Sequence, residues 1–307
     1  MTANADRSSA ALKSPTGPER FATLTFEREA NAPVSVLWQA WTAPAAREVW
    51  AAPTPAVTVE FVEADTRVGG REISLCKVAG QPDIRCEVGW LDLQPMVRSV
   101  NYEVVSTGGE TQSAALVTAE FSGQGERSRL VVTVQLSSLE ADMAAGYRQG
   151  FDAGVGNLAG VAERTMVIER VIKAPRSVVW GAWVNPENLP QWWGPDGYSC
   201  RTSRIDLRTG GEWVFDMIGP DGTVYPNHHR YVEVRPEDGL AYTLLWGENG
   251  PKHADAWIAF EDLGDATRVT LGMVMNTAEE YQQAKGFGAI ELGQQTLGKL
   301  ERFILSR

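Results

Sequence analysis

Short runs of alternating apolar and polar residues follow one another along the second half of the chain. Alternation with a period of two is the pattern of β-strands that bury one face and expose the other. It predicts strands at residues 165–172, 201–207, 212–218, 229–234, 240–246, 256–261 and 267–275. The segments between them carry turn signals, namely Gly210-Gly211, Pro220-Asp221-Gly222 and Gly264-Asp265. Because such short turns join neighbouring strands as hairpins, the sheet is expected to be antiparallel.

Two helical segments flank the predicted strands. The first follows Ala174-Pro175, where proline suits the first helical turn because its missing N–H has no partner there. Its apolar positions recur at helical spacing, at Val179, Trp180 and Trp183. The second is expected as one long helix over residues 277–305, with an inward face marked by Ile290, Leu297, Leu300 and Ile304. Since the helices are segregated from the strands rather than alternating with them, the fold class is α+β.

The first half of the chain repeats the pattern of the second. Residues 26–41 align with residues 168–183, and the alignment continues from 65–70 to 206–211 and from 125–129 to 264–268. The offset falls only from 142 to 139 residues along this course, so the two copies share one fold and differ by small loop deletions. We therefore predict two domains, at residues 21–163 and 164–307, each a curved antiparallel sheet around a long C-terminal helix. Residues 1–20 lack periodicity and are predicted to form a disordered tail.

Composition and charge disfavour several classes of function. The formal net charge is −11 and no run of Lys or Arg occurs, which disfavours nucleic-acid binding. No stretch reaches the roughly 18 apolar residues of a membrane span, and the N-terminus lacks the apolar core of a secretory signal. A cytoplasmic protein without a membrane partner is therefore expected. The 11 tryptophans point instead to aromatic cores or to apolar cavities that receive a ligand.

The three cysteines, Cys76, Cys86 and Cys200, are too few for a disulfide framework and match no zinc motif in their spacing. Cys76 and Cys86 flank a predicted turn at residues 80–83, which makes them candidates for facing each other across a hairpin. We interpret them as reduced thiols that behave as small apolar groups. Neither a metal nor a cofactor is expected.

One set of residues in the second half forms a recognisable pattern. It consists of Arg170, Ala174-Pro175, Val179-Trp180, Ala182-Trp183, Pro186, Leu189, Trp192-Trp193-Gly194-Pro195, Asp206, Arg208, Gly210-Gly211, Trp213, Gly219-Pro220-Asp221-Gly222, Tyr231, Glu233 and Pro236. With this pattern, residues 164–307 resemble the activator of heat-shock protein 90 ATPase homologue family, within the START-like (polyketide cyclase/dehydrase and lipid-transport) superfamily. The first half keeps Ala32-Pro33, Trp38, Trp41, Pro44, Trp50 and Gly69-Gly70, but has Ala51-Ala52 where the double tryptophan would continue.

The resemblance implies two START-like helix-grip domains in tandem, with a cavity between each sheet and its long helix. It also implies a family with several roles: ligand binding, cyclisation or dehydration in natural-product pathways, sequestration of a toxic product, and co-chaperone activity. A shared fold does not choose among them.

Strand alternation places Trp213, Phe215 and Met217 on one face of the second sheet. If the hairpin at residues 220–222 pairs in even register, that face also carries His229, Tyr231 and Glu233. Beneath the long helix it would form an aromatic cavity with polar groups at one end, the usual composition of a small-molecule site. The predicted ligand-binding residues are Trp180, Trp183, Trp192, Trp193, Trp213, Phe215, Met217 and Trp257. The alternative is that these rings simply form the core.

His229 is the best candidate for acid–base catalysis, with Tyr231 and Glu233 as catalytic neighbours. An unperturbed imidazole titrates near neutral pH, as a general base requires. The alternative is a histidine whose hydrogen bonds are satisfied in the core. A metal site formed by His228 and His229 is disfavoured because adjacent strand residues point to opposite faces.

The equivalent face of the first domain is more polar. Glu72, Ser74 and Cys76 replace Trp213, Phe215 and Met217. With Cys86, Trp90 and Asp92 across the hairpin, this group could support nucleophilic or acid–base chemistry. No histidine lies in this half to activate a thiol, so we favour a structural duplicate over a second active site.

The leading hypothesis is that the second domain binds a small hydrophobic or aromatic molecule. An enzyme is the alternative, a cofactor-independent cyclase, dehydratase or hydrolase of secondary metabolism that uses His229, as is sequestration of a toxic product. A co-chaperone role is the least supported. The sequence leaves open the identity of the ligand, whether one or both domains bind it, and whether the chain forms a homodimer.

Overall fold

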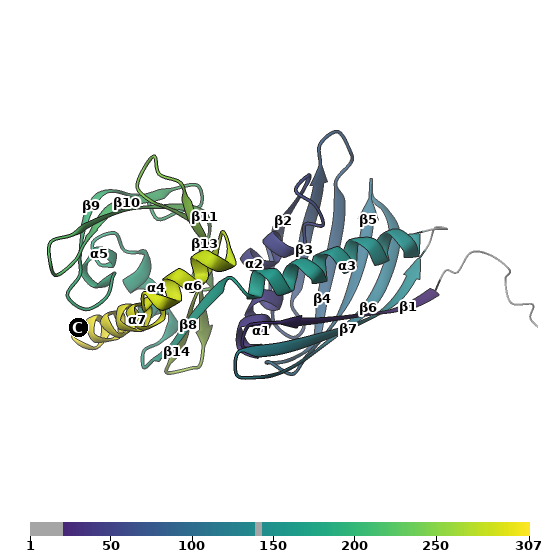
Figure 1. The fold of residues 1–307 in the computed structure, drawn as a ribbon, viewed down its shortest axis with the longest axis horizontal. Helices are drawn as coiled ribbons and strands as arrows, with labels where there is room; N and C mark the ends of the chain where they lie inside the picture. Colours follow the sequence, from purple (N-terminus) through teal and green to yellow (C-terminus); the bar gives the residue numbers. More distant parts are fainter. Residues whose placement is uncertain (1–20, 139–142) are drawn as a thin grey trace, which may run out of the picture.

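The fold consists of two domains side by side, each with a seven-stranded antiparallel sheet and a long helix (Figure 1). The computed structural model describes residues 21–138 and 143–307. The tail predicted at residues 1–20 lies outside the described residues. Among the described helices, none combines the length and apolar character needed to cross a bilayer.

The first domain begins with a strand and two short helices, continues as a meander and closes with a helix. Its sheet has the order β1-β7-β6-β5-β4-β3-β2. Its elements are β1 (Phe21–Ala30), α1 (Val34–Thr42), α2 (Pro44–Trp50), β2 (Val57–Ala64), β3 (Arg71–Val78), β4 (Ile84–Gln94), β5 (Arg98–Thr107), β6 (Glu110–Gln124), β7 (Arg127–Ser138) and α3 (Met143–Ala162).

The second domain repeats this order, with its first and last strands paired and the helices against one face of the sheet. Its sheet has the order β8-β14-β13-β12-β11-β10-β9. Its elements are β8 (Thr165–Ile172), α4 (Arg176–Val184), α5 (Leu189–Trp192), β9 (Ser199–Ile205), β10 (Glu212–Ile218), β11 (Val224–Arg235), β12 (Gly239–Leu245), β13 (Lys252–Asp262), β14 (Thr267–Met275), α6 (Ala278–Gly286) and α7 (Ala289–Leu305).

The prediction of one unbroken helix over residues 277–305 is wrong. The chain forms two helices, α6 and α7, which meet at Phe287 and Gly288. Gly288 has φ 89°, a left-handed conformation that glycine adopts without steric cost. Thr277 starts α6 by accepting a hydrogen bond from the Glu280 N–H at 3.1 Å. The second domain therefore has an elbow between two helices.

Helices α3 and α7 occupy equivalent places. Val155 and Leu158 in α3 and, 142 residues later, Leu297 and Leu300 in α7 are all at most 1% exposed. Asn157 of α3 and Lys299 of α7 are also equivalent, and both tie the long helix to the chain near a short helix. Asn157 donates to backbone carbonyls at the end of α2, and Lys299 donates to backbone carbonyls after α5. This register makes Tyr147 and Phe151 the counterparts of Ala289 and Gly293.

The two domains share an apolar interface. Trp257 of β13 and Val274 of β14 belong to the buried cluster of the first domain, and α1 and α2 contact β8 and β13. Trp257 lies over Gly272 of β14, where an added Cβ would fall 2.0 Å from the indole ring. The prediction that Trp257 binds ligand is therefore wrong, since it faces the first domain.

The first sheet differs from the second at the position that matches Trp257. The cross-strand pair equivalent to Trp257 and Gly272 is Thr118 opposite Thr133, and both are only partly buried. Threonine side chains are commonly exposed to solvent, so this pair does not need to be covered by another domain. The indole of Trp257 and the glycine beneath it are thus particular to the second sheet, where the first domain covers them.

We predict that Trp257→Ala uncouples the two domains. Removing a buried indole costs about 3–5 kcal/mol, and here the loss falls on the interface. Calorimetry should show the single or overlapping transition of the wild type separate into two. Trp246→Ala, which removes a half-exposed indole of the same size, is the control. An unchanged calorimetric profile for Trp257→Ala would contradict the assignment.

Candidate functional site

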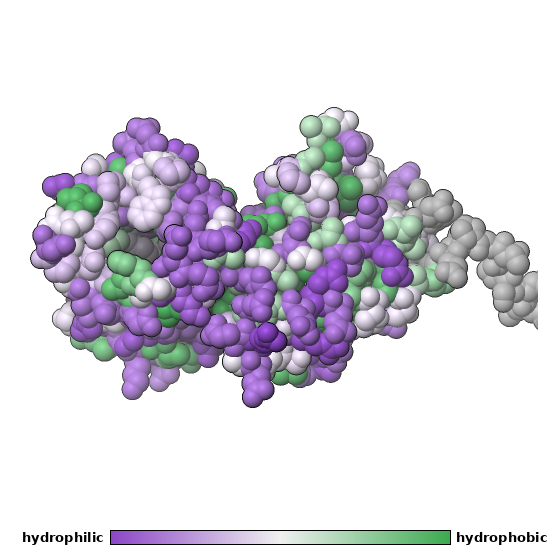
Figure 2. Space-filling view, in the orientation of Figure 1, coloured by the Kyte–Doolittle hydropathy of each residue, from purple (hydrophilic) through white to green (hydrophobic). Residues whose placement is uncertain are grey.

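A cavity of about 810 Å³ lies inside the second domain, between the sheet and helices α6 and α7. Figure 2 shows its mouth as a hollow on the face of this domain. Most of its lining is apolar. The apolar lining residues include Met166, Ile168, Trp193, Met217, Leu244, Leu271, Met273, Met275, Phe287 and Leu292.

The predicted even register of the hairpin at residues 220–222 is confirmed. Trp213 pairs with His229, Phe215 with Asn227 and Met217 with Tyr225. Trp213 and Phe215 stack with ring centroids 3.7 Å apart, and both make edge contacts with His229. They are fully buried and support the cavity wall from behind, whereas His229 and Met217 reach the cavity itself.

The tryptophans of α4 and α5 divide into core and lining residues. Trp183 and Trp192 are buried and pack edge to face at 4.8 Å. Trp180 is partly buried against Phe260. Only Trp193 of this group lines the cavity, where its ring lies 5.6 Å from His229. Of the eight predicted ligand-binding residues, the cavity lining thus includes Trp193 and Met217.

The predicted catalytic group of His229, Tyr231 and Glu233 is not assembled. A β-bulge between Tyr231 and Glu233 shifts the register of β11, so Glu233 pairs with Ala241 and faces away from the cavity. Its carboxylate forms an ion pair with Arg235. Tyr231 is buried in the core, 5.9 Å from Tyr242, and does not line the cavity. Only His229 remains at the site.

His229 is an uncharged group in this cavity at neutral pH. It is 3% exposed, and burial lowers its pKa to about 3, with a smaller contribution from His228. Its ring stacks on Tyr242 at 4.3 Å, and burial raises the pKa of the Tyr242 hydroxyl. A base with so low a pKa accepts protons poorly near neutral pH, so the site favours hydrogen bonding over proton transfer.

His228 lies on the opposite face of β11, as strand parity predicts. Its Nε2 is 2.8 Å from a carboxylate oxygen of Glu212. Within residues 21–138 and 143–307, no group of three or more His, Cys, Asp or Glu side chains is placed to hold a metal ion.

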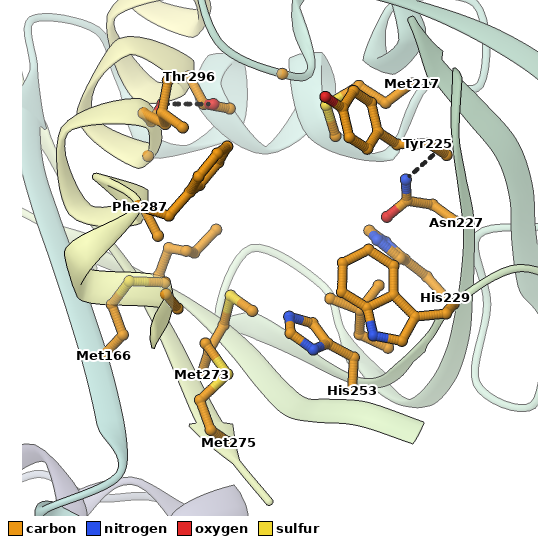
Figure 3. Close-up of a pocket in the computed structure, with 18 of the residues that line it drawn as sticks. Met166, Met217, Tyr225, Asn227, His229, His253, Met273, Met275, Phe287 and Thr296 are labelled. Carbon is orange, nitrogen blue, oxygen red and sulfur yellow. Dashed lines mark hydrogen bonds between the residues drawn. The ribbon is translucent and has the colours of Figure 1, made fainter. Parts of the chain in front are cut away.

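Several cavity residues were missed by the sequence prediction. Figure 3 shows the methionines Met166, Met273 and Met275 along one wall and Tyr225, Asn227 and His229 on another. Met273 and Met166 are direct cross-strand partners in β14 and β8. Strand parity alone identifies Met273 and Met275 as a pair on one face. No local sequence pattern predicts that β14 pairs with the distant β8, which brings Met166 next to them.

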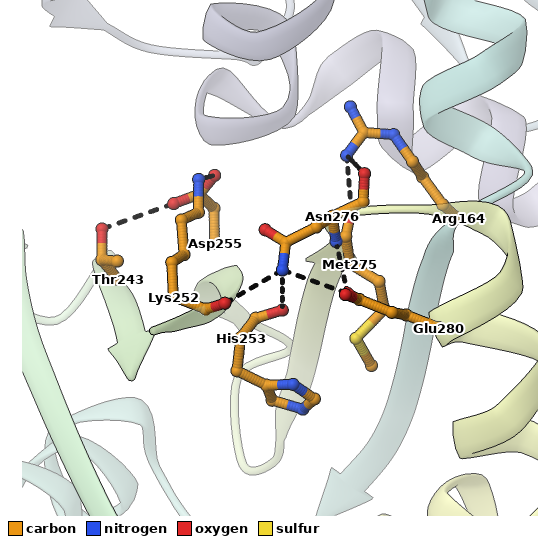
Figure 4. A network of polar contacts seen from close by, with 8 residues as sticks. All are labelled: Arg164, Thr243, Lys252, His253, Asp255, Met275, Asn276 and Glu280. Atoms are coloured by element: carbon orange, nitrogen blue, oxygen red, sulfur yellow. Dashed lines mark hydrogen bonds and ion pairs between the residues drawn. The ribbon is translucent and has the colours of Figure 1, made fainter. Parts of the chain in front are cut away.

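A polar network holds α6 at the edge of the cavity (Figure 4). The Asn276 side chain donates to the carbonyls of Lys252 and His253 and to Glu280 at 3.0–3.3 Å. Arg164, which precedes β8, donates to the Met275 carbonyl. The start of α6 is thereby tied to β13, and through β14 to the segment that links the two domains.

The acidic side chains predicted on the polar face of the first domain form ion pairs with arginines of the same domain. Glu72 is 1% exposed and forms an ion pair with Arg47, whose guanidinium lies 5.4 Å from the Trp90 ring. Ser74 is buried beside them in β3. Asp92 follows a bulge like that of β11 and pairs with Arg98 at 2.7 Å. The predicted Cys/Glu/Asp group is therefore not assembled.

The two thiols of the first domain are also poor nucleophiles. Cys86 lies opposite Ser74 and Cys76 opposite Ile84, so the thiols share a face without being direct partners. Burial raises the pKa of both, and a thiol that stays protonated is unreactive.

Comparison with known proteins identifies related sequences and structures. A family model described as Activator of Hsp90 ATPase homolog 1-like protein matches residues 31–163 and again residues 173–304. No curated protein matches the sequence.

Three solved structures are each similar to nearly half of this chain. Protein Ms6760 from Mycobacterium smegmatis is 23% identical, with a TM-score of 0.44 over 48% of this chain and 94% of its own. Protein NE0264 from Nitrosomonas europaea is 29% identical, with a TM-score of 0.43 over 47% and 96%. Protein Mll3558 from Rhizobium loti is 28% identical, with a TM-score of 0.41 over 45% and 95%.

The pKa of His229 predicts a pH dependence of stability. The folded-state pKa of about 3 lies below the ordinary value of 6.5. Below pH 6.5 the unfolded chain therefore takes up a proton that the folded chain does not, and stability falls as pH falls. Between about pH 6 and 4, unfolding free energy should fall by about 1.4 kcal/mol per pH unit more in the wild type than in His229→Gln.

Chemical denaturation of both proteins across this pH range measures the difference. Tyr242→Phe is the control, because it alters the neighbouring ring without removing a group that titrates in this range. A stability difference between wild type and His229→Gln that does not vary with pH would show that His229 titrates normally.

Proposed function

Because the chain belongs to the activator of Hsp90 ATPase homologue 1-like family and consists of two START-like helix-grip domains in tandem, we propose that its second domain binds a small hydrophobic or aromatic molecule. The binding site is the cavity between the sheet and helices α6 and α7.

The observation that carries this proposal is the cavity itself. Its volume of about 810 Å³ falls within the range of roughly 300–1,000 Å³ that is usual for small-molecule sites. A space of this size inside a domain forfeits the packing contacts that a filled core would make. A guest molecule restores them, and the apolar lining selects a guest that is mostly apolar.

The rim of the cavity supports the same function. Phe287, at the elbow between α6 and α7, is 71% exposed although it borders the cavity. On the other side Trp246 is 49% exposed and packs against His253 at 4.4 Å. Large exposed aromatic groups beside a cavity offer apolar surface to an arriving ligand.

Thermal unfolding in the presence of aromatic and aliphatic hydrophobic compounds tests the proposal. A ligand that binds only the folded state at 100 times its Kd stabilises it by about 2.7 kcal/mol, which is a measurable rise in Tm. If no compound of a broad panel raises Tm at concentrations up to its solubility limit, the cavity does not serve as a ligand site.

We predict that Ala289→Tyr weakens ligand binding while the domain stays folded. Ala289 lines the cavity, and its counterpart in the first domain is Tyr147, so a tyrosine ring at this place is compatible with the fold. Affinity for any ligand found should fall at least about tenfold, or about 1.4 kcal/mol. Isothermal titration measures the loss.

Gln282→Tyr is the matched control, because it places the same side chain on an exposed position of α6 away from the cavity. It should bind ligand as the wild type does. Equal affinity of Ala289→Tyr and Gln282→Tyr would place the ligand elsewhere.

A further inference from the structure

The first domain fills the space equivalent to the cavity with its own aromatic side chains. Tyr147 and Phe151 of α3 stand where α7 has Ala289 and Gly293, and their rings stack with centroids 5.6 Å apart. Phe151 also packs against Phe26 of β1 at 5.0 Å. The Tyr147 hydroxyl donates to the carboxylate of Glu103 at 2.7 Å. In the first copy, then, a phenol ring lies between helix and sheet with its hydroxyl on a hydrogen-bond acceptor of the sheet.

The second domain lacks these rings and carries hydrogen-bonding groups on the cavity wall instead. Glu103 is replaced by Leu244, whereas Val88 and Cys86 are replaced by His229 and Asn227, as the paired registers show. Asn227 donates its amide N–H to the Tyr225 carbonyl at 2.8 Å, and Figure 3 shows its oxygen directed toward the cavity.

His229 is the second polar group on this wall. It is 97% buried, lines the cavity, and forms no hydrogen bond with any described residue. The hydroxyl of Tyr242, which stacks on it, likewise has no hydrogen-bond partner among the described residues. Neither residue contributes to the enclosed side-chain atoms that lack a partner, so their polar groups border the cavity, where a ligand or water can satisfy them.

Charged groups of the cavity are already engaged. Among the described lining residues, Lys252 and Glu280 carry a formal charge. Lys252 forms an ion pair with Asp255, and Glu280 accepts from Asn276 at 3.1 Å. An ionised ligand would therefore enter a low-dielectric space without a counter-charge, which is costly.

On these grounds we propose that the cavity binds an uncharged, planar aromatic molecule that carries a hydroxyl group. The hydroxyl hydrogen-bonds to His229 and Asn227, and the rings lie against the methionine side chains of β8 and β14. Methionine suits this role because its thioether is polarizable and packs on ring edges. This inference rests on the proposed function and specifies the class of its ligand.

Three fluorescent probes with the same ring system test the inference: pyrene, 1-hydroxypyrene and 1-pyrenecarboxylate. Each is titrated into the full chain at pH 7. We expect 1-hydroxypyrene to bind about tenfold more tightly than pyrene, since it satisfies buried polar groups. The carboxylate should bind at least about tenfold more weakly than pyrene because it is ionised.

Variants of the wall identify the groups that recognise the hydroxyl. His229→Phe should remove the advantage of 1-hydroxypyrene over pyrene, measured in each protein as the ratio of the two affinities. His229→Gln, which keeps a hydrogen-bonding group, should retain part of it. Val232→Gln, on an exposed position of the same strand, is the control. The comparison of the three probes on the unmodified chain decides the inference even if a variant does not fold.

The outcomes separate the two proposals. If none of the probes binds, this inference is overturned, and the thermal-unfolding panel decides the ligand-binding function separately. If all three bind with equal affinity, or if the carboxylate binds best, the ligand class is wrong and the ligand-binding function stands. If the preference for 1-hydroxypyrene survives in His229→Phe, the hydroxyl is recognised by other groups and the inference is overturned.

Discussion

The separation between sheet and helix depends on the size of the side chains that the helix turns toward the sheet. In the second domain those side chains are small at Ala289 and Gly293, and an added Cβ at Gly293 would lie 2.1 Å from the Cδ1 of Ile168. Close contact at this point fixes α7 on β8, and the lack of bulky groups next to it leaves the interior hollow. In the first domain, Tyr147 and Phe151 fill the same space. One fold therefore supports a cavity in one copy and an aromatic core in the other.

The buried charges of the first copy follow from the same difference. With Glu72 in place of Trp213, the sheet needs a counter-charge, and Arg47 of α2 supplies it between the rings of Phe61 and Trp90. An ion pair that is almost fully buried tolerates the loss of neither partner, because the remaining charge would be stranded. The first domain thus has a buried ion pair where the second has Trp213, and it covers the apolar face of the second sheet.

Local patterns in the sequence were sufficient for the architecture and for the register of the hairpin that positions His229. Turn residues set which side chains share a face, so Trp213, Met217 and His229 could be grouped without a structure. Glu233 and Asp92 could not be placed, because each follows a bulge that no local pattern marks and that reverses the facing of the strand.

Other features depended on contacts between distant segments. Trp257 stands in a continuous apolar run, from Ala256 to Ile258, in which parity does not tell the inner face from the outer one. Its orientation depends on the first domain covering the second sheet. The methionine wall requires the pairing of β8 with β14, the first and last strands of the domain. Gly286 and Gly288 indicate a break in the helix, but the regular apolar spacing of the residues that follow predicted one continuous helix.

The contact between the domains joins two unlike surfaces, the helices α1 and α2 on one side and the outer face around Trp257 on the other. A contact between two unlike surfaces can repeat without limit, because each further domain of the same kind would present the surface that the next domain binds. Thr118 and Thr133 interrupt such a series, because the first sheet has two partly buried hydroxyl-bearing side chains where the second has an indole over a glycine. The apolar seat that α1 and α2 occupy around Trp257 on the second sheet therefore has no counterpart at the matching position of the first sheet.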